Sequence, residues 1–197
     1  MQARILETAD RLFYGQGIRA IGVETVADEI GISKRTLYNH YPSKDALIAA
    51  YLSRRLIELK ITDQPPLEQI LGAFDRLERA VASGRFRGCP FVNAVAELGQ
   101  EVREASKLAV AFKERRRLWF RELLSRLGVA DANGIATQLA LLLDGAIATS
   151  LIRGDPAFVR AAKAAAVTLI EAGARRKRSK PARSLHQHAG RHRRLHG

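Results

Sequence analysis

A run of seven residues from Lys34 to His40, KRTLYNH, carries a dense row of hydrogen-bonding side chains around one apolar residue. If the run is helical, Leu37 points inward and the polar residues cover the opposite and flanking faces. Those residues are Lys34, Arg35, Thr36, Tyr38, Asn39 and His40. Arginine can bond a guanine edge through two N–H groups, and asparagine and threonine can bond bases or phosphates, in a major groove that admits a helix. The run therefore has the chemistry needed to read duplex DNA.

The preceding segment predicts the elements that would hold this run in place. Ala27 is small enough to let two helices cross closely, and Gly31 can adopt the left-handed conformation that follows a helix end. Ser33 stands where an N-cap is expected, so the second helix should begin at the next residue. A small core between the helices would contain Val26, Ile30, Ile32 and Leu37. Residues 22–41 are therefore predicted to form a helix-turn-helix; the alternative is a solvated helical hairpin with the same spacing.

A further cation follows this motif. Lys44 comes directly after Ser43, which is the expected cap of another helix. A lysine beside the free N–H groups of a helix start can hold a phosphate of the DNA backbone. The alternative is an ordinary lysine in a first helical turn.

The charge of the chain indicates a polyanionic partner. The formal net charge is +13 over 197 residues, and nine of the basic residues lie in residues 174–197, which contain no acidic residue. Subtracting these nine leaves +4 for the remainder, so the body of the protein is only mildly basic. The basic, histidine-rich segment is predicted to be a disordered tail that binds polyanions weakly.

Cysteine usage and hydropathy favour a cytoplasmic protein. The single Cys89 has no partner in the chain, as expected in a reducing compartment. The first helix lacks the apolar core of a secretory signal, and the longest apolar run, from Leu139 to Ile152, contains Asp144 and is too short to cross a bilayer. No membrane partner is predicted.

Helical periodicity dominates the whole chain, and no period-two strand pattern is present, so the predicted fold is all-α with about nine helices. Three helices would form a DNA-binding domain over residues 1–45, and a helical ligand-binding and dimerisation domain would follow over 46–173, before the tail at 174–197. A helix starting after Ser43 should end near Lys60, before a break at Thr62–Pro66. The later helices are expected over 67–83, 91–98, 104–127, 131–153 and 155–172.

The second domain has a candidate ligand chamber. Five residues of the helices over 91–98 and 104–127 have spacings that can point inward together: Phe91, Asn93, Glu97, Phe112 and Trp119. They would give an apolar chamber with a few polar groups. The alternative is a core that holds no ligand, with Trp119 as a packing residue.

The last two expected helices are rich in leucine and alanine, which permit close helix approach. Their broad apolar surface either completes the core of a monomer or packs against a second copy as a four-helix interface. We favour the homodimer, because one short recognition helix gains affinity and specificity when it is paired.

The order of these parts resembles the tetracycline-repressor (TetR) family of bacterial transcriptional regulators. The resemblance is carried by GISKRTLYNHYPSKDAL over residues 31–47, and GCPFVNAVAEL over 88–98 resembles the regulatory domain of one subgroup. It implies a homodimer whose recognition helices enter successive major grooves of a near-palindromic operator, with a small-molecule pocket in each C-terminal domain and, usually, repression. The positions that match DNA-facing residues of the family are Thr25, Lys34, Arg35, Thr36, Tyr38, Asn39, His40 and Lys44, among which Tyr38 and Lys44 typically hold phosphates.

The sequence departs from the family pattern at its second helix, where Gly22 replaces a frequent capping threonine and Glu24 lies near the expected phosphates. Glu24 is favourable there only if it points at its own helix N-terminus.

The sequence also bears on two other classes of function. An enzyme is not predicted, because no nucleophile elbow, phosphate-binding glycine loop, catalytic triad or paired metal ligands are visible, and neither cofactor nor metal is expected. A non-specific or architectural DNA-binding protein driven by the basic tail is the alternative to an operator-specific regulator.

Overall fold

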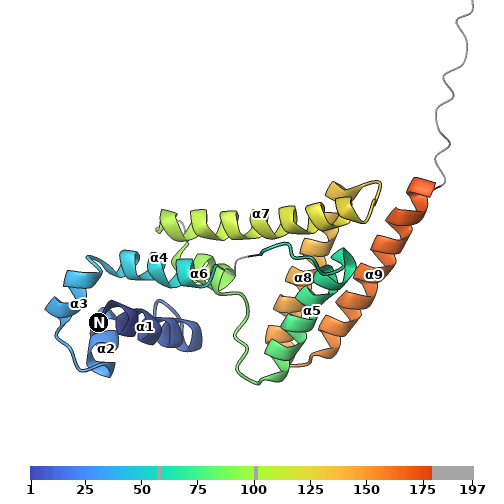
Figure 1. Ribbon diagram of the computed structural model, residues 1–197. Helices are drawn as coiled ribbons and strands as arrows, with labels where there is room; N and C mark the ends of the chain where they lie inside the picture. Colours follow the sequence, from blue (N-terminus) through green and yellow to red (C-terminus); the bar gives the residue numbers. More distant parts are fainter. Residues whose placement is uncertain (57–58, 100–101, 179–197) are drawn as a thin grey trace, which may run out of the picture.

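The computed structural model describes residues 1–56, 59–99 and 102–178, and these residues form nine α-helices and no strand. The all-α prediction is confirmed. Figure 1 shows helices α1 to α4 gathered at one end of the molecule and α5, α8 and α9 at the other, with the long helix α7 extending along both groups. The N-terminal group presents the recognition helix, and the C-terminal group holds the cavities.

The N-terminal group begins with three helices, α1 (Gln2–Gln16), α2 (Val23–Glu29) and α3 (Lys34–His40). Their inward faces meet in one apolar core whose most buried members are Ile5, Ala9, Val26 and Leu37, each with no exposed surface. Ile30 and Ile32 pack against this core but are only partly buried. The crossing of α2 and α3 is therefore fixed by burial on one side, which leaves the other side of α3 to solvent.

Helix α4 (Lys44–Arg54) joins the two groups and is shorter than the sequence predicts, because it ends at Arg54 and not near Lys60. Arg55 instead binds Asp10 of α1, with 2.8 Å from its Nη2 to Oδ2, and stacks over the ring of Tyr14 at 4.4 Å. Five residues after Arg55, the carbonyl of Lys60 accepts the indole N–H of Trp119 at 3.3 Å. These tertiary contacts override a local sequence that favours a continued helix.

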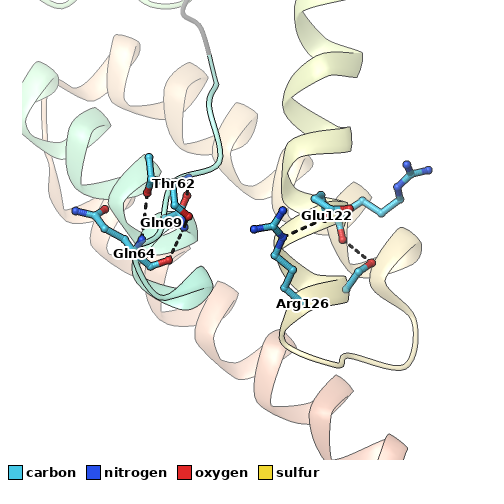
Figure 2. Close-up of polar contacts among 7 residues, drawn as sticks. Thr62, Gln64, Gln69, Glu122 and Arg126 are labelled. Atoms are coloured by element: carbon cyan, nitrogen blue, oxygen red, sulfur yellow. Dashed lines mark hydrogen bonds and ion pairs between the residues drawn. The ribbon is translucent and has the colours of Figure 1, made fainter.

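Gln69 fixes the segment before α5 (Pro66–Ala82), as Figure 2 shows. Its buried amide nitrogen donates to the carbonyls of Thr62 and Gln64 at 3.1 and 2.6 Å, and its amide oxygen accepts the Thr62 N–H at 3.0 Å. Pro66 occupies the first turn of α5, where its missing N–H costs nothing. The backbone groups of Thr62 and Gln64, just before α5, are therefore satisfied by this one side chain.

The remaining helices are α6 (Pro90–Leu98), α7 (Arg103–Arg126), α8 (Ala132–Arg153) and α9 (Ala157–Arg178). Asp131 caps α8 by accepting the Gly134 N–H at 2.9 Å, and Asp155 accepts the Ala157 N–H at 2.8 Å before α9. Helix α8 packs along both α7 and α9, and α5 packs on α7 and α9. Phe74, Phe120 and Leu139 lie at the centre of this second core.

Helix α8 is long and apolar enough to span a membrane by length and composition, and 33% of its most apolar stretch is buried inside the chain. Asp144, near its middle, pairs with Lys113 and Arg116 of α7. The helix thus contributes to the core of the C-terminal group, and it also carries apolar surface that this chain alone does not cover.

Helix α9 runs to Arg178, so the first five residues of the predicted tail, 174–178, are helical. Gly173 is a residue type at which helices often end, but the alanine and arginine residues that follow it favour helix, and α9 continues through it. The rest of the predicted tail, residues 179–197, lies outside the described residues.

Candidate nucleic-acid interface and ligand chamber

The recognition helix α3 starts at a well-defined turn. Gly31 has a φ of 70°, and the N–H of Ile32 donates to the Ala27 carbonyl at 3.0 Å, which closes the end of α2. Ser33 then caps α3, its Oγ accepting the Thr36 N–H at 3.0 Å. The turn and the cap together therefore fix the direction in which α3 leaves α2.

The outer face of α3 is polar and accessible. Leu37 is fully buried, whereas Lys34, Arg35, Tyr38, Asn39 and His40 are exposed. Within the described part of the chain, the side chains of Arg35, Asn39 and His40 make no hydrogen bond or ion pair, so their donors and acceptors are available to a ligand. Thr36 differs, because it is partly buried and its hydroxyl lies 2.9 Å from the Ser33 Oγ.

Glu24 lies on the same surface, in the first turn of α2, and forms an ion pair with Lys34. The Lys34 hydrogen bond and then a bond from the Glu24 backbone hold the pKa of this carboxyl below its usual range, and the carboxyl raises the pKa of Lys34. The backbone bond means that Glu24 does turn towards its own helix start, where negative charge is favourable. Thr25, beside it, is exposed.

Lys44 is the first residue of α4 and is partly buried. Ser43 caps this helix by accepting the Ala46 N–H at 3.0 Å, as its position predicts. The positive charge of Lys44 also lowers the pKa of Glu24, which places the lysine near the start of α2. The starts of α2 and α4 thus present a cation and helix N–H groups beside α3, a suitable arrangement for backbone phosphates.

Replacing Glu24 with glutamine should strengthen DNA binding, because Lys34 would lose its internal counter-charge and neutralise a phosphate instead. The slope of log affinity against log salt should become steeper by about 0.9. Because the carboxyl pKa is lowered and the ammonium pKa is raised, the pair stays ionised through neutrality, and the effect should be equal at pH 6 and pH 8. Fluorescence anisotropy with a labelled duplex measures both quantities.

The matched control is Glu29→Gln, which also removes one exposed negative charge from α2 but releases Arg11 instead. An equal gain in both variants would mean that only net charge matters and that Lys34 has no special position.

Two of the cavities in the C-terminal group include aromatic residues of the predicted chamber in their walls. An inner chamber of about 230 Å³, partly open to solvent, is lined by α5, α7, α8 and the segments around Leu59 and Cys89, and its wall includes both Phe112 and Trp119. A wider groove of about 680 Å³ lies between α6, α7 and α8 and includes Phe91. Phe91 and Phe112 stack with ring centroids 4.3 Å apart and so form the partition between them.

The expectation that five residues share one chamber fails for Asn93 and Glu97, which line neither of these two cavities. Asn93 donates to the Arg87 carbonyl at 2.7 Å, and Glu97 accepts the backbone N–H of Arg19 at 2.9 Å. The physical reason is that α6 faces two neighbours. Its apolar side meets α7, and its polar side meets the loop that follows α1.

These polar contacts connect the two groups of helices. The hydroxyl of Tyr14, on α1, donates to the Gly88 carbonyl at 3.1 Å and accepts the Arg87 N–H at 3.0 Å. Gly88 is part of the chamber wall. It has a φ of 83°, and a Cβ there would lie 3.0 Å from Leu151, so this backbone conformation and close packing require glycine.

Sequence reasoning missed the polar residues of the chamber itself, Arg76 and Arg116. Arg116 belongs to the run Arg115–Arg117, which has the composition of a solvated helix face. A signal was present nonetheless, since position 116 is four residues after Phe112 and three before Trp119 and therefore shares their side of the helix.

A helix-turn-helix with an accessible polar helix, joined to a helical domain that contains a chamber, defines a DNA-binding transcriptional regulator. Residues 5–51 match the profile described as bacterial regulatory proteins, tetR family. The chain belongs to the TetR family of transcriptional regulators. Its relatives are regulators of transcription and not enzymes, which confirms that expectation.

Solved structures and curated relatives agree along most of the chain. A Streptomyces avermitilis protein described as a TetR transcriptional regulator has a TM-score of 0.77 and 32% identity, covering 87% of this chain and 97% of its own. A TetR-family regulator from Streptomyces coelicolor gives a TM-score of 0.79 and 27% identity, with coverages of 87% and 95%. The HTH-type transcriptional regulator YjdC of Escherichia coli is 27% identical over 163 residues, 79% of this chain and 85% of YjdC.

Proposed function

We propose that the protein is a ligand-responsive repressor in the cytoplasm that binds a palindromic operator as a homodimer and is released by a small molecule. The observation that carries the proposal is the exposed face of α3, where Arg35, Asn39 and His40 have no partner among the described residues. Arg35 is assigned to a base edge, and Tyr38 and Lys44 to phosphates. Thr36 is assigned mainly to the start of α3, because its hydroxyl already contacts Ser33.

The homodimer is supported by the outer surface of α8 and α9. A groove of about 630 Å³ runs between them and is lined mainly by alanine, leucine and Phe158. Leu141, on its edge, is 66% exposed, an unusual position for a large apolar residue in a helix otherwise packed on two neighbours. A second copy packed on these two helices would bury this surface in a four-helix interface.

Ligand response is supported by the contacts between the chamber wall and the DNA-binding domain. Gly88 lines the chamber, and its carbonyl accepts a hydrogen bond from the hydroxyl of Tyr14 on α1. A ligand that bound better to one arrangement of these segments would shift the spacing of the two recognition helices. DNA release is then a change in population between two dimer geometries.

The alternative of a non-specific DNA-binding protein driven by the basic segment makes a different prediction. Truncation after Arg178 removes five basic residues of the segment that lies outside the described residues. We expect the truncated protein to lose affinity for random DNA and to keep its preferred sequence, because phosphate attraction carries no base information. A changed sequence preference would favour the alternative.

The test of the proposed function is selection of bound fragments from a random duplex pool by the full chain, followed by competition with random DNA. We expect enrichment of a sequence with twofold symmetry, bound at least about 1,000-fold more tightly than random duplex. Equal affinity for all duplexes would contradict the proposal. The selected duplex then serves as the reporter for release by small molecules.

A further inference from the structure

Arg116 is a buried charged residue with an unused donor. Its side chain is 7% exposed, and one terminal nitrogen binds Asp144, which also binds the Nζ of Lys113 at 2.6 Å. Its Nε, however, is buried and has no hydrogen-bond partner among the described residues. An unsatisfied buried donor on a charged group is rare and costly, and it indicates that a partner is missing from the chain itself.

Arg116 lines both the inner chamber and the wider groove, and the inner chamber contains a second guanidinium. Arg76, on α5, lines the chamber from its solvent-exposed side and forms no hydrogen bond or ion pair within the described ranges. Burial, and then the neighbouring charge of Arg79, lower the pKa of Arg76, so its charged form is less stable there than in water. An anion in the chamber would offset both the burial of the Arg76 charge and its repulsion by Arg79.

The remainder of the chamber wall is apolar. Leu77, Phe112, Trp119 and Ile147 contribute to it, and none of the described residues of the wall is a carboxylate. Asp144 pairs with both Arg116 and Lys113, so a single carboxylate compensates these two cations and Arg76 adds a further positive charge among the described residues. The volume of about 230 Å³ is below the range of about 300 to 1,000 Å³ that is usual for drug-sized ligands. The chamber therefore suits a small molecule with one negative charge and an apolar body.

We infer that the inner chamber binds a small apolar carboxylate, whose oxygens accept hydrogen bonds from Arg116 and Arg76. A planar guanidinium matches a carboxylate in geometry, and the bond to Arg116 is strengthened because Arg116 is buried away from water. The apolar body lies against Phe112 and Trp119. This ligand class is the inducer of the regulator only if the proposed function holds, whereas binding itself does not depend on DNA.

The chain offers a direct reporter, because Trp119 is its single tryptophan and lies in the chamber wall. The experiment titrates the full chain at pH 7 with 3-phenylpropionate and with the straight-chain acids from butanoate to octanoate, following tryptophan emission and heat of binding. The matched neutral probe is 3-phenylpropionamide. We expect at least one acid to bind and 3-phenylpropionate to bind about tenfold or more tightly than its amide.

Variants locate the site. Arg116→Met and Arg76→Met should each weaken binding of the acid by about tenfold and leave the amide unchanged, whereas Arg116→Lys should retain part of the affinity. Arg79→Met is the control, since Arg79 is exposed on the same helix and does not line the chamber. Circular dichroism melting verifies that each variant is folded, and Arg76→Met keeps the test valid if loss of the buried Arg116 prevents folding.

Three results would overturn the inference: no acid in the series binds, acid and amide bind equally, or both arginine variants bind the acid as the native chain does. Inorganic phosphate binding as tightly as the acids would overturn the role of the apolar body. Failure here with intact operator binding leaves the regulator proposal standing. Conversely, tight acid binding that never releases the operator would contradict the ligand-release part of the proposed function and support the chamber assignment.

Discussion

The variant Arg35→Ala should bind the selected operator about 1 to 3 kcal/mol more weakly than the native chain, while its affinity for random duplex changes little. Arg35 is exposed on the outer face of α3 and has no partner within the described residues, so alanine removes a base contact without disturbing the fold. The loss should be concentrated at one base pair in each half-site. Anisotropy titrations with the operator and with single-base variants measure this.

The matched control is Arg79→Ala, which removes an exposed arginine from α5, far along the chain from the recognition helix. It should leave operator affinity unchanged. If Arg35→Ala instead weakens all duplexes to the same extent, Arg35 contacts a phosphate and base readout must lie with Asn39 or other residues of α3.

The variant Leu141→Glu should make the protein monomeric and reduce operator affinity by about 100-fold or more, because two linked half-site contacts are replaced by one. Leu141 is 66% exposed on α8 and borders the apolar groove shared with α9. A glutamate there places a charge in the proposed interface, where it has no internal partner and cannot reach water. Analytical ultracentrifugation gives the mass, and anisotropy gives the affinity.

Leu67→Glu provides the comparison, since Leu67 is an exposed leucine at the start of α5 outside that groove. It should leave both mass and operator affinity unchanged. A native chain that sediments as a monomer at the concentrations where it binds the operator would contradict the homodimer, whatever the variants do.

Features set by local chemistry could be predicted from the sequence. Ser33, Ser43 and Asp131 all accept hydrogen bonds from the helix starts that follow them, and Gly31 has the positive φ that its place after α2 requires. These groups act within three or four residues, so their spacing alone carries the information. The burial of Leu37 against an exposed polar face follows from helical periodicity in the same way.

Features set by distant contacts could not be predicted from the sequence. The end of α4 depends on Arg55 reaching Asp10 and on Lys60 meeting Trp119, pairs that are 45 and 59 residues apart. The same holds for Glu97, whose carboxylate accepts a hydrogen bond from the backbone N–H of Arg19, 78 residues away. This bond turns Glu97 away from the expected chamber and towards the loop that follows α1. Periodicity places a residue on a helix face, but it does not say which neighbour covers that face.

Methylation interference on the selected operator tests the central claim most directly, because N7 of guanine is reached only from the major groove. We predict that N7 methylation blocks binding at two symmetric positions about 10 base pairs apart or a multiple of that distance, and that Arg35→Ala abolishes the interference at one guanine in each half-site. Interference that is absent from the major groove, or confined to one side of the site, would contradict an account in which paired copies of α3 read the DNA.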